Sequence, residues 1–329
     1  VLLGWDITGG SVMTLACFFL VASYAINALS PVLAGKFQVS TTIIKLIPLM
    51  LMAVVGTIIG LSNGMTVNNF THVVDSSVST SSGLFASVVA VAFAYEGWII
   101  ATSINAELKD SKKNLPRALV IGSLIVAFVY IFYYIGLTGA VSTETLMESG
   151  ETGAMLASQN IFGTVGGTLI FVFVIISCLG TLNGLMLGCT RGMYSLAVRN
   201  KGPLREMFKQ VDEISNMPTN SAVLGVLLSA VWLLYFYGAN LTDPWFGVFC
   251  FDSSELPIIT LYAAYIPIFI MMMKKEKGLS TFKRIVMPLL SIIGCLFMVV
   301  AAILAHGMAV VYYLIVFAVI MFIGSFFKN

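Results

Sequence analysis

The feature that most constrains this chain is a series of apolar runs, each long enough to cross a lipid bilayer. We recognise nine of them, at 11–33, 41–61, 84–106, 117–141, 162–190, 219–238, 249–273, 284–305 and 308–327. A spanning helix needs roughly 20 apolar residues. Because the hydrocarbon offers no water to satisfy backbone groups, runs of this kind must be helical. We therefore predict an all-α polytopic membrane protein, a multi-pass integral protein of the cell membrane.

Composition excludes a soluble globular protein and several classes of site. Hydrophobic residues make up 59% and charged residues only 10% of the 329 residues, whereas a soluble domain carries about 25% charged residues. The cysteines show neither a CxxC pair nor a metal-binding spacing, so we predict no metal and no cofactor. A net charge of +2 gives no reason to expect a nucleic-acid partner.

The basic residues predict the orientation of the chain. Sixteen of the 17 lie in alternate connections or at the C-terminus, namely Lys36, Lys109, Lys112, Lys113, Arg117, Arg191, Arg199, Lys201, Arg205, Lys209, Lys274, Lys275, Lys277, Lys283, Arg284 and Lys328. The opposite loops, 62–83, 142–161 and 239–248, contain none. By the positive-inside rule the basic side is cytoplasmic, so nine spans place the N-terminus outside and the C-terminus inside. The remaining basic residue, Lys45, falls within a span.

The third span contains an ionisable residue beside a glycine, at Glu96 and Gly97. A carboxylate at membrane depth costs several kcal/mol unless it faces a cavity or a partner, and glycine weakens a helix. This pair indicates a helix split into halves of roughly 84–93 and 98–107. The dipole ends at such a break suit a zwitterionic ligand. A simple kink lined by a buried, protonated glutamate fits the same spacing.

The residues around this pair resemble a known transporter family. Residues 93–98 (FAYEGW), followed by 107–109 (ELK) and 114–118 (NLPRA), are similar to the sixth helix and following loop of the amino acid–polyamine–organocation (APC) superfamily. The closest similarity is to L-type amino acid transporters and bacterial serine/threonine exchangers, which carry FAY(G/D)GW and then E(L/M)xNPxxNLPxA. Here residues 110–111 (DS) replace Asn-Pro, and Glu replaces Gly or Asp at position 96.

Two more segments support the resemblance in the expected order. Residues 38–47 (QVSTTIIKLI) are similar to the fifth helix of the family. Residues 177–184 (SCLGTLNG), with Arg191 and 199–204 (RNKGPL) downstream, are similar to its eighth helix and the loop that follows. The similarity extends over essentially the whole chain and assigns the nine spans to family helices four through twelve.

This assignment implies a LeuT-like fold that lacks the first three family helices. Residues 1–61 would then be a remnant of the first inverted repeat, 84–273 the second repeat, and 284–329 a C-terminal helix pair. An outside start with no basic leader agrees with an N-terminal truncation. Because the missing first helix holds the substrate carboxylate in the family, we expect this chain to carry half of a binding site.

The resemblance also implies roles for the residues at the break. Phe93 would be an aromatic gate over the substrate, the backbone carbonyls of Ala94, Tyr95 and Glu96 would hold the substrate ammonium, and Gly97 would permit the unwound backbone. Ordinary packing is the alternative for Phe93. The Glu96 side chain could neutralise a cation, take part in proton coupling or cap the second half-helix, and we favour capping because the family tolerates Gly or Asp there.

Other candidate residues lie on the second and fifth spans. Cys178 and Thr181 share a helical face by their i, i+3 spacing, so with Asn183 they could line the cavity. Interhelical hydrogen bonding is an equal alternative for this set. In the family a lysine at the place of Lys45 occupies the site where sodium-coupled relatives bind Na⁺. The alternative for Lys45 is snorkelling to the membrane surface.

Together these residues predict a secondary active transporter that works by alternating access. We expect neutral amino acids as substrates, with exchange or proton symport as the coupling, and the lipid bilayer as the surrounding partner; an accessory subunit is not specified. Alternatives are a non-transporting fragment, or a transporter of another small amine or a polyamine. An enzyme is not indicated, because the chain has no HExxH or GxSxG motif and its two histidines, His72 and His306, are far apart.

Overall fold

The structure, a computed structural model, describes residues 9–71, 80–103, 105, 108–251 and 256–327. Over these residues the secondary structure is helical, without a strand. Three residues used above, His72, Glu107 and Lys328, lie outside the described ranges. An all-α chain is what the apolar runs predict, because only helices satisfy their own backbone groups within one membrane-spanning segment.

The helices follow one another with short connections. In chain order they are α1 Gly9–Leu29, α2 Pro31–Leu51, η1 Met52–Gly56, α3 Thr57–Ser62, α4 Met65–Thr71, α5 Thr80–Tyr95, α6 Ile100–Ser103, α7 Ser111–Ala140, α8 Thr143–Ser149, η3 Gly150–Thr152, α9 Gly153–Ala197, α10 Arg205–Phe208, α11 Thr219–Phe236, η4 Tyr237–Leu241, η5 Gly247–Phe249, α12 Leu256–Lys275, η6 Phe282–Val286, α13 Met287–His306 and α14 Met308–Ser325.

Nine helical segments of the described chain are long and apolar enough to cross a membrane. This confirms the predicted multi-pass membrane protein. The second segment, Val32–Ser62, is longer than a bilayer requires because η1 and α3 continue α2 without a turn. The fifth, Gly153–Ala197, contains a break at Gly163, where φ is 71° and ψ is 175°. Its membrane-spanning part therefore begins close to the start of the apolar run at 162–190. The orientation of the termini stays a prediction.

The chain forms two compact units. The first unit comprises residues 1–75, 97–200 and 204–231, and the second comprises 76–96, 201–203 and 232–329. The predicted assignment of 1–61, 84–273 and 284–329 to repeats is a separate matter and stays a prediction.

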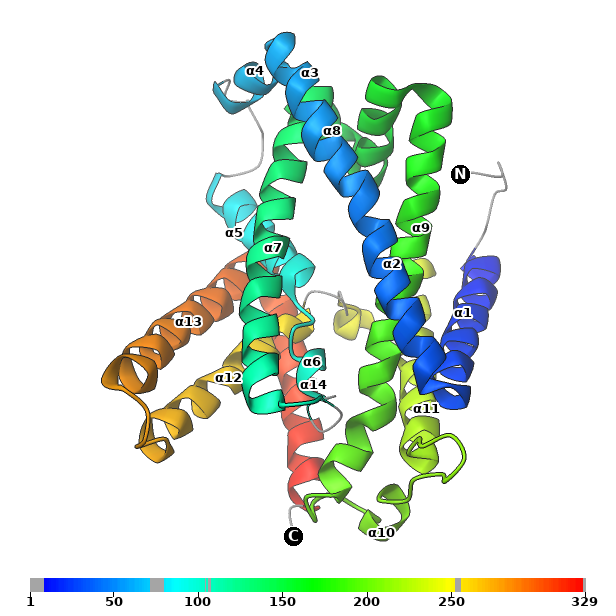
Figure 1. The fold of residues 1–329 in the computed structure, drawn as a ribbon, viewed down its shortest axis with the longest axis vertical. Helices are drawn as coiled ribbons and strands as arrows, with labels where there is room; N and C mark the ends of the chain where they lie inside the picture. The colour runs from blue at the N-terminus through cyan, green and yellow to red at the C-terminus, as the bar shows by residue number, and fades with distance from the viewer. Residues whose placement is uncertain (1–8, 72–79, 104, 106–107, 252–255, 328–329) are drawn as a thin grey trace. The chain divides into compact units, whose positions relative to one another are not determined.

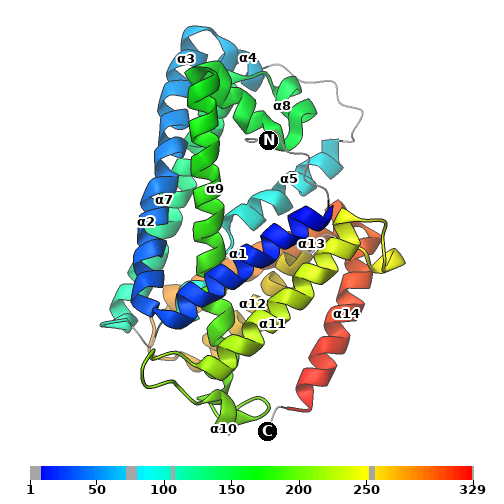
Figure 2. The ribbon, with the colours of Figure 1, turned by 90° about the vertical axis from the view of Figure 1, so that its right-hand side faces the viewer.

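In the first unit α2 runs beside α7 and α9 (Figure 1, Figure 2). Glycines allow α7 to approach the end of α2 very closely. A Cβ atom added to Gly136 would collide with the carbonyl oxygen of Met52, and one added to Gly139 would collide with the carbonyl oxygen of Gly56. Small residues at such crossings are the usual means by which membrane helices reach van der Waals contact. At this crossing the helices thus pack backbone against backbone.

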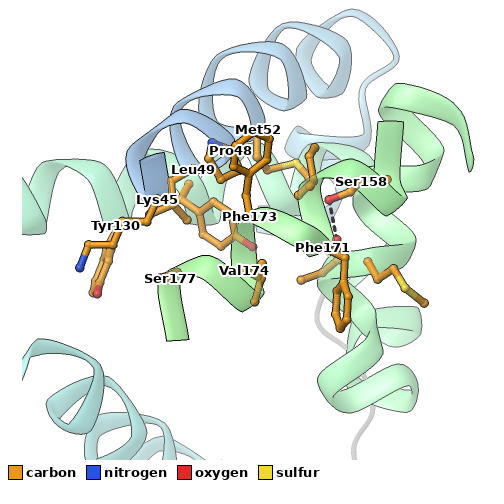
Figure 3. A pocket seen from close by; sticks show the side chains of 15 residues that line it. Lys45, Pro48, Leu49, Met52, Tyr130, Ser158, Phe171, Phe173, Val174 and Ser177 are labelled. Carbon is orange, nitrogen blue, oxygen red and sulfur yellow. Dashed lines mark hydrogen bonds between the residues drawn. The ribbon is translucent and has the colours of Figure 1, made fainter. Parts of the chain in front are cut away.

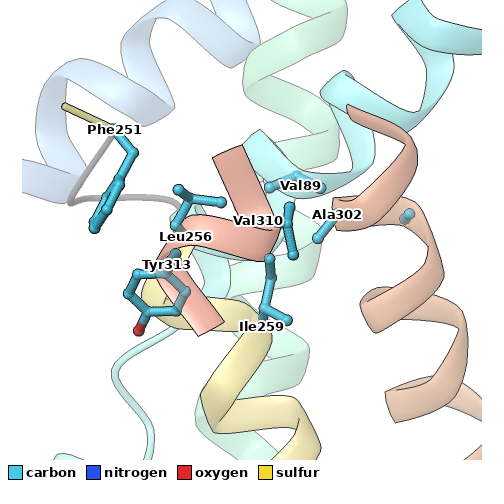
Figure 4. Close-up of a cluster of buried hydrophobic side chains, with 8 residues drawn as sticks. Val89, Phe251, Leu256, Ile259, Ala302, Val310 and Tyr313 are labelled. Carbon is cyan, nitrogen blue, oxygen red and sulfur yellow. The ribbon is translucent and has the colours of Figure 1, made fainter. Parts of the chain in front are cut away.

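The second unit is built around the antiparallel pair α12 and α13, with α5 and α14 packed against it. Figure 4 shows its buried apolar core, whose members are Val89, Phe251, Leu256, Ile259, Ala301, Ala302, Val310 and Tyr313. The Tyr313 hydroxyl lies 3.1 Å from the hydroxyl of Thr260. A hydrogen bond at this position satisfies two polar groups that would otherwise be buried among hydrocarbon side chains.

Candidate functional site

The third span is split at Glu96 and Gly97. Helix α5 ends at Tyr95, and α6 begins at Ile100. The Glu96 amide donates to Phe93 O at 3.2 Å, an i→i−3 bond that interrupts the α-helical ladder. The amide of Ile100 then bonds to Gly97 O at 3.1 Å, again three residues back. The predicted break in the helix is confirmed.

Gly97 is required at the break because of its backbone conformation. Its φ is +117°, in the region that side-chain-bearing residues rarely adopt, and an added Cβ would meet no atom within 4 Å. The constraint is therefore conformational and does not come from crowding. Glycine enters this region at no steric cost, which explains why a helix-weakening residue is found at membrane depth.

The carboxyl group of Glu96 is hydrogen-bonded within the second unit. The Tyr265 hydroxyl, on α12, donates to Glu96 Oε1 at 3.3 Å. The other oxygen, Oε2, is buried and has no hydrogen-bond partner in the described part of the chain. The ring of Tyr262, one turn earlier on α12, contacts the Tyr265 ring edge to face, with centroids 5.8 Å apart. This carboxyl group thus ties the end of α5 to α12.

The residues before the break lie at the end of α5. The Phe93 side chain is 51% exposed. Tyr95 lines a shallow apolar groove in the second unit together with Val91, Tyr262 and Met298. An exposed aromatic ring beside a helix break is compatible with a gate and equally with packing, so the role of Phe93 stays a prediction.

A separate cavity of about 300 Å³ lies within the first unit. It is bounded by α2, α7 and α9, and Figure 3 shows Lys45 reaching its edge, with Pro48, Phe173 and Val174 among its apolar walls. The polar groups on its lining include the Ser158 hydroxyl, which donates to Ala154 O at 2.8 Å. Lys45 is thus the basic side chain of an otherwise largely apolar cavity.

Comparison with known proteins identifies the family of this chain. The family model described as "Amino acid permease" matches residues 3–326, nearly the whole chain. The chain belongs to the amino acid permease family. This confirms the superfamily that the motifs of the third and fifth spans indicated, and it is a family of transport proteins, not of enzymes.

Individual relatives give the same result. The permease is 30% identical to the serine/threonine exchanger SteT of Bacillus subtilis over 292 residues, 86% of this chain and 62% of SteT. It is 29% identical to the Asc-type amino acid transporter 1 of Mus musculus over 189 residues, 57% of this chain and 35% of that protein. It is 24% identical to the human cystine/glutamate transporter over 199 residues, 60% of this chain and 38% of that protein. The permease thus spans under two thirds of the length of these relatives.

The three candidate residues on α9 do not share one environment. Asn183 is 2% exposed and accepts a hydrogen bond from Asn27 Nδ2 at 2.9 Å. Its own amide group donates to Gln38 Oε1 at 3.0 Å and to Ala34 O at 3.3 Å. Asn183 thus joins α9 to both α1 and α2.

The other two α9 candidates lie on an exposed part of that helix. The Cys178 thiol is exposed, and the Thr181 hydroxyl donates to Ser177 O within the same helix at 3.1 Å. The side-chain hydrogen bonds of Asn183 run between helices, whereas that of Thr181 stays within α9. Whether any of the three contacts substrate stays a prediction.

Sequence reasoning missed two partners of the candidate residues. Tyr265 was not selected, although the i, i+3 pair Tyr262 and Tyr265 on one apolar span was a visible signal. Asn27 was also missed, and an asparagine within an apolar run is a comparable signal for an interhelical hydrogen bond. In both cases a polar residue within a span needs a partner, but the sequence does not reveal which one.

Proposed function

We propose that the permease is part of a secondary transporter that moves amino acids across the membrane by alternating access. The observation that carries this proposal is the split of the third span at Gly97. A helix that ends at membrane depth presents the negative end of its dipole there. That end suits an ammonium group, and discontinuous helices form substrate sites in this way in many transporters.

The substrate ammonium would lie against the carbonyl end of α5, at Ala94, Tyr95 and Glu96. Phe93 would cover the substrate from one side. Neutral amino acids are the proposed substrates, because we favour a capping role for Glu96, and a carboxylate that caps the second half-helix would not be left to pair with a cationic side chain. Support also comes from relatives that are named as serine/threonine and Asc-type amino acid transporters.

Gly97 would also act as the hinge of the transport cycle. The chain passes from the second unit to the first between Glu96 and Gly97. A glycine tolerates a wide range of φ values, so a change in its backbone angles could accompany reorientation of one unit against the other. Exchange and proton symport both fit such a cycle, and transport assays would distinguish these two modes of coupling.

Counterflow in proteoliposomes tests the function. Vesicles that contain the complete transporter and are loaded with unlabelled L-serine should accumulate labelled L-serine, and excess L-threonine should compete. Gly97→Ala forces φ out of its observed region at a cost on the order of 1–3 kcal/mol, so we expect roughly tenfold slower uptake.

Gly122→Ala is the matched control for this variant. Gly122 lies within α7, and a Cβ added there meets no atom within 4 Å, so its uptake should stay within about twofold of the unmodified protein. Uptake that no neutral amino acid inhibits would refute the substrate class. Full activity in Gly97→Ala would refute the role of the break.

A further inference from the structure

Figure 1 shows the connection between α12 and α13 at one end of the second unit. The sequence of this connection concentrates positive charge. We call residues 274–284 the basic hairpin. Its cationic side chains are Lys274, Lys275, Lys277, Lys283 and Arg284, set against a single carboxylate, Glu276. Such a concentration immediately beside membrane-spanning helices attracts anionic groups near the bilayer surface.

The charges of the basic hairpin are available to an external anion. All four of its lysine side chains are exposed, and none forms an ion pair or side-chain hydrogen bond with another described residue. The loop after α9 is different, because there Lys209 pairs with Glu206 at 3.1 Å and bonds Asn200 Oδ1 at 2.7 Å. Lysines that are not engaged within the protein retain their full attraction for a ligand.

Arg284 adds a directional donor to this set. Its Nε is buried and has no hydrogen-bond acceptor among the residues that the structure describes. A buried donor without an acceptor is unfavourable, the more so on a charged group. Phosphate oxygens match the forked geometry of a guanidinium group, which binds them through parallel hydrogen bonds.

The depth of the basic hairpin matches the headgroup layer of a membrane. It joins two membrane-length segments, Leu256–Lys275 and Phe282–His306, so it lies where the chain leaves the hydrocarbon. Phe282 and Ile285 are exposed beside the cations, at 60% and 39%. Apolar side chains next to lysines and arginines are typical of a surface that contacts acyl chains and headgroups together.

We propose that the basic hairpin binds the phosphate headgroups of anionic phospholipids, with Arg284 as the anchoring residue and the lysines around it. The ligand is a lipid and not a free anion, because exposed apolar side chains adjoin the cations. This site does not depend on which solute the permease carries.

Native mass spectrometry of the full chain in detergent tests the lipid site. The protein would be titrated with dioleoyl phosphatidylglycerol and, separately, with dioleoyl phosphatidylcholine. We expect tighter binding of the anionic lipid. Lys277→Gln/Lys283→Gln should weaken that binding by roughly tenfold or more, because each basic residue near an anionic surface adds a similar amount to the binding free energy. Circular dichroism would establish that the variants keep their helix content.

Lys112→Gln/Lys113→Gln is the matched control, because it removes two exposed lysines from the start of α7. Its binding of phosphatidylglycerol should stay within about twofold. An equal loss in this control would show a diffuse attraction and overturn the site, as would equal affinity for the two lipids.

Two further measurements test whether the ligand is a lipid or a free phosphate ion, and whether Arg284 anchors it. Inorganic phosphate at the same concentration as the lipid should not displace it; displacement would identify a free anion as the ligand and overturn the proposal. Arg284→Lys keeps the charge and removes the planar guanidinium group that matches phosphate oxygens, so weaker binding is expected. Unchanged binding would refute Arg284 as the anchor.

Discussion

At the scale of single residues, the most informative contact is that between Glu96 and Tyr265. A carboxyl group within a membrane span is expensive unless a partner satisfies it, and the Tyr265 hydroxyl supplies a hydrogen bond to one of its oxygens. The partner explains how Glu96 is accommodated where relatives of the L-type class carry Gly or Asp. It also shows that α12, and not only the broken span, shapes the surroundings of the break.

Removal of the Tyr265 hydroxyl should destabilise the second unit. In Tyr265→Phe the ring remains but Glu96 Oε1 loses its donor, which costs roughly 1–3 kcal/mol for a buried polar group. We expect a lower midpoint of thermal unfolding in detergent, followed by the fluorescence of a thiol-reactive dye. Tyr262→Phe, which keeps the neighbouring ring and leaves that hydrogen bond in place, should unfold close to the unmodified protein. Equal midpoints for both variants would contradict a stabilising role for the contact.

At the scale of helices, the first unit depends on glycine for the approach of α7 to the end of α2. Lipid tails are as apolar as most side chains, so membrane helices gain little from burying hydrophobic area against each other. Close backbone contact at Gly136 and Gly139 and the hydrogen bonds of Asn183 therefore add to a small buried apolar cluster formed by Met52, Val141 and Ala157.

Gly136→Ala should disrupt this packing. Its new methyl group would collide with the backbone of Met52, and backbone cannot move aside as a flexible side chain can, so we expect a loss of about 1–3 kcal/mol of stability. Urea or detergent-denaturation midpoints would measure the loss. Gly122→Ala on the same helix adds its methyl group to open space and should be neutral. A neutral Gly136→Ala would mean that α7 and α2 can separate at little cost.

At the scale of the whole molecule, the sequence and the structure together describe an amino acid permease whose candidate site residues are distributed over both units. Phe93 to Glu96 belong to the second unit, and Gly97, Lys45 and Asn183 belong to the first.

Transport should not require sodium, because the ammonium group of Lys45 would supply the positive charge that a bound Na⁺ supplies in sodium-coupled relatives. Serine counterflow should be the same within about twofold when choline replaces external Na⁺. Lys45→Ala should impair it, whereas Lys36→Ala, at an exposed position on the same helix, should not. Uptake that scales with external Na⁺ and persists in Lys45→Ala would contradict the hypothesis.

Local chemistry was enough to predict the nine spans and the all-helical class; at Gly97 it allowed either a break or a simple kink, and the family resemblance favoured the break. Hydropathy over some 20 residues and the conformational freedom of one glycine are properties of a single segment. They can be judged from the sequence without knowing which other helices pack against that segment. Tyr265 lies 169 residues from Glu96, and Asn27 lies 156 residues from Asn183. Only the folded chain identifies these partners. In a membrane nearly every face of a helix is apolar, so the faces that meet are chosen by close packing and by scarce polar groups.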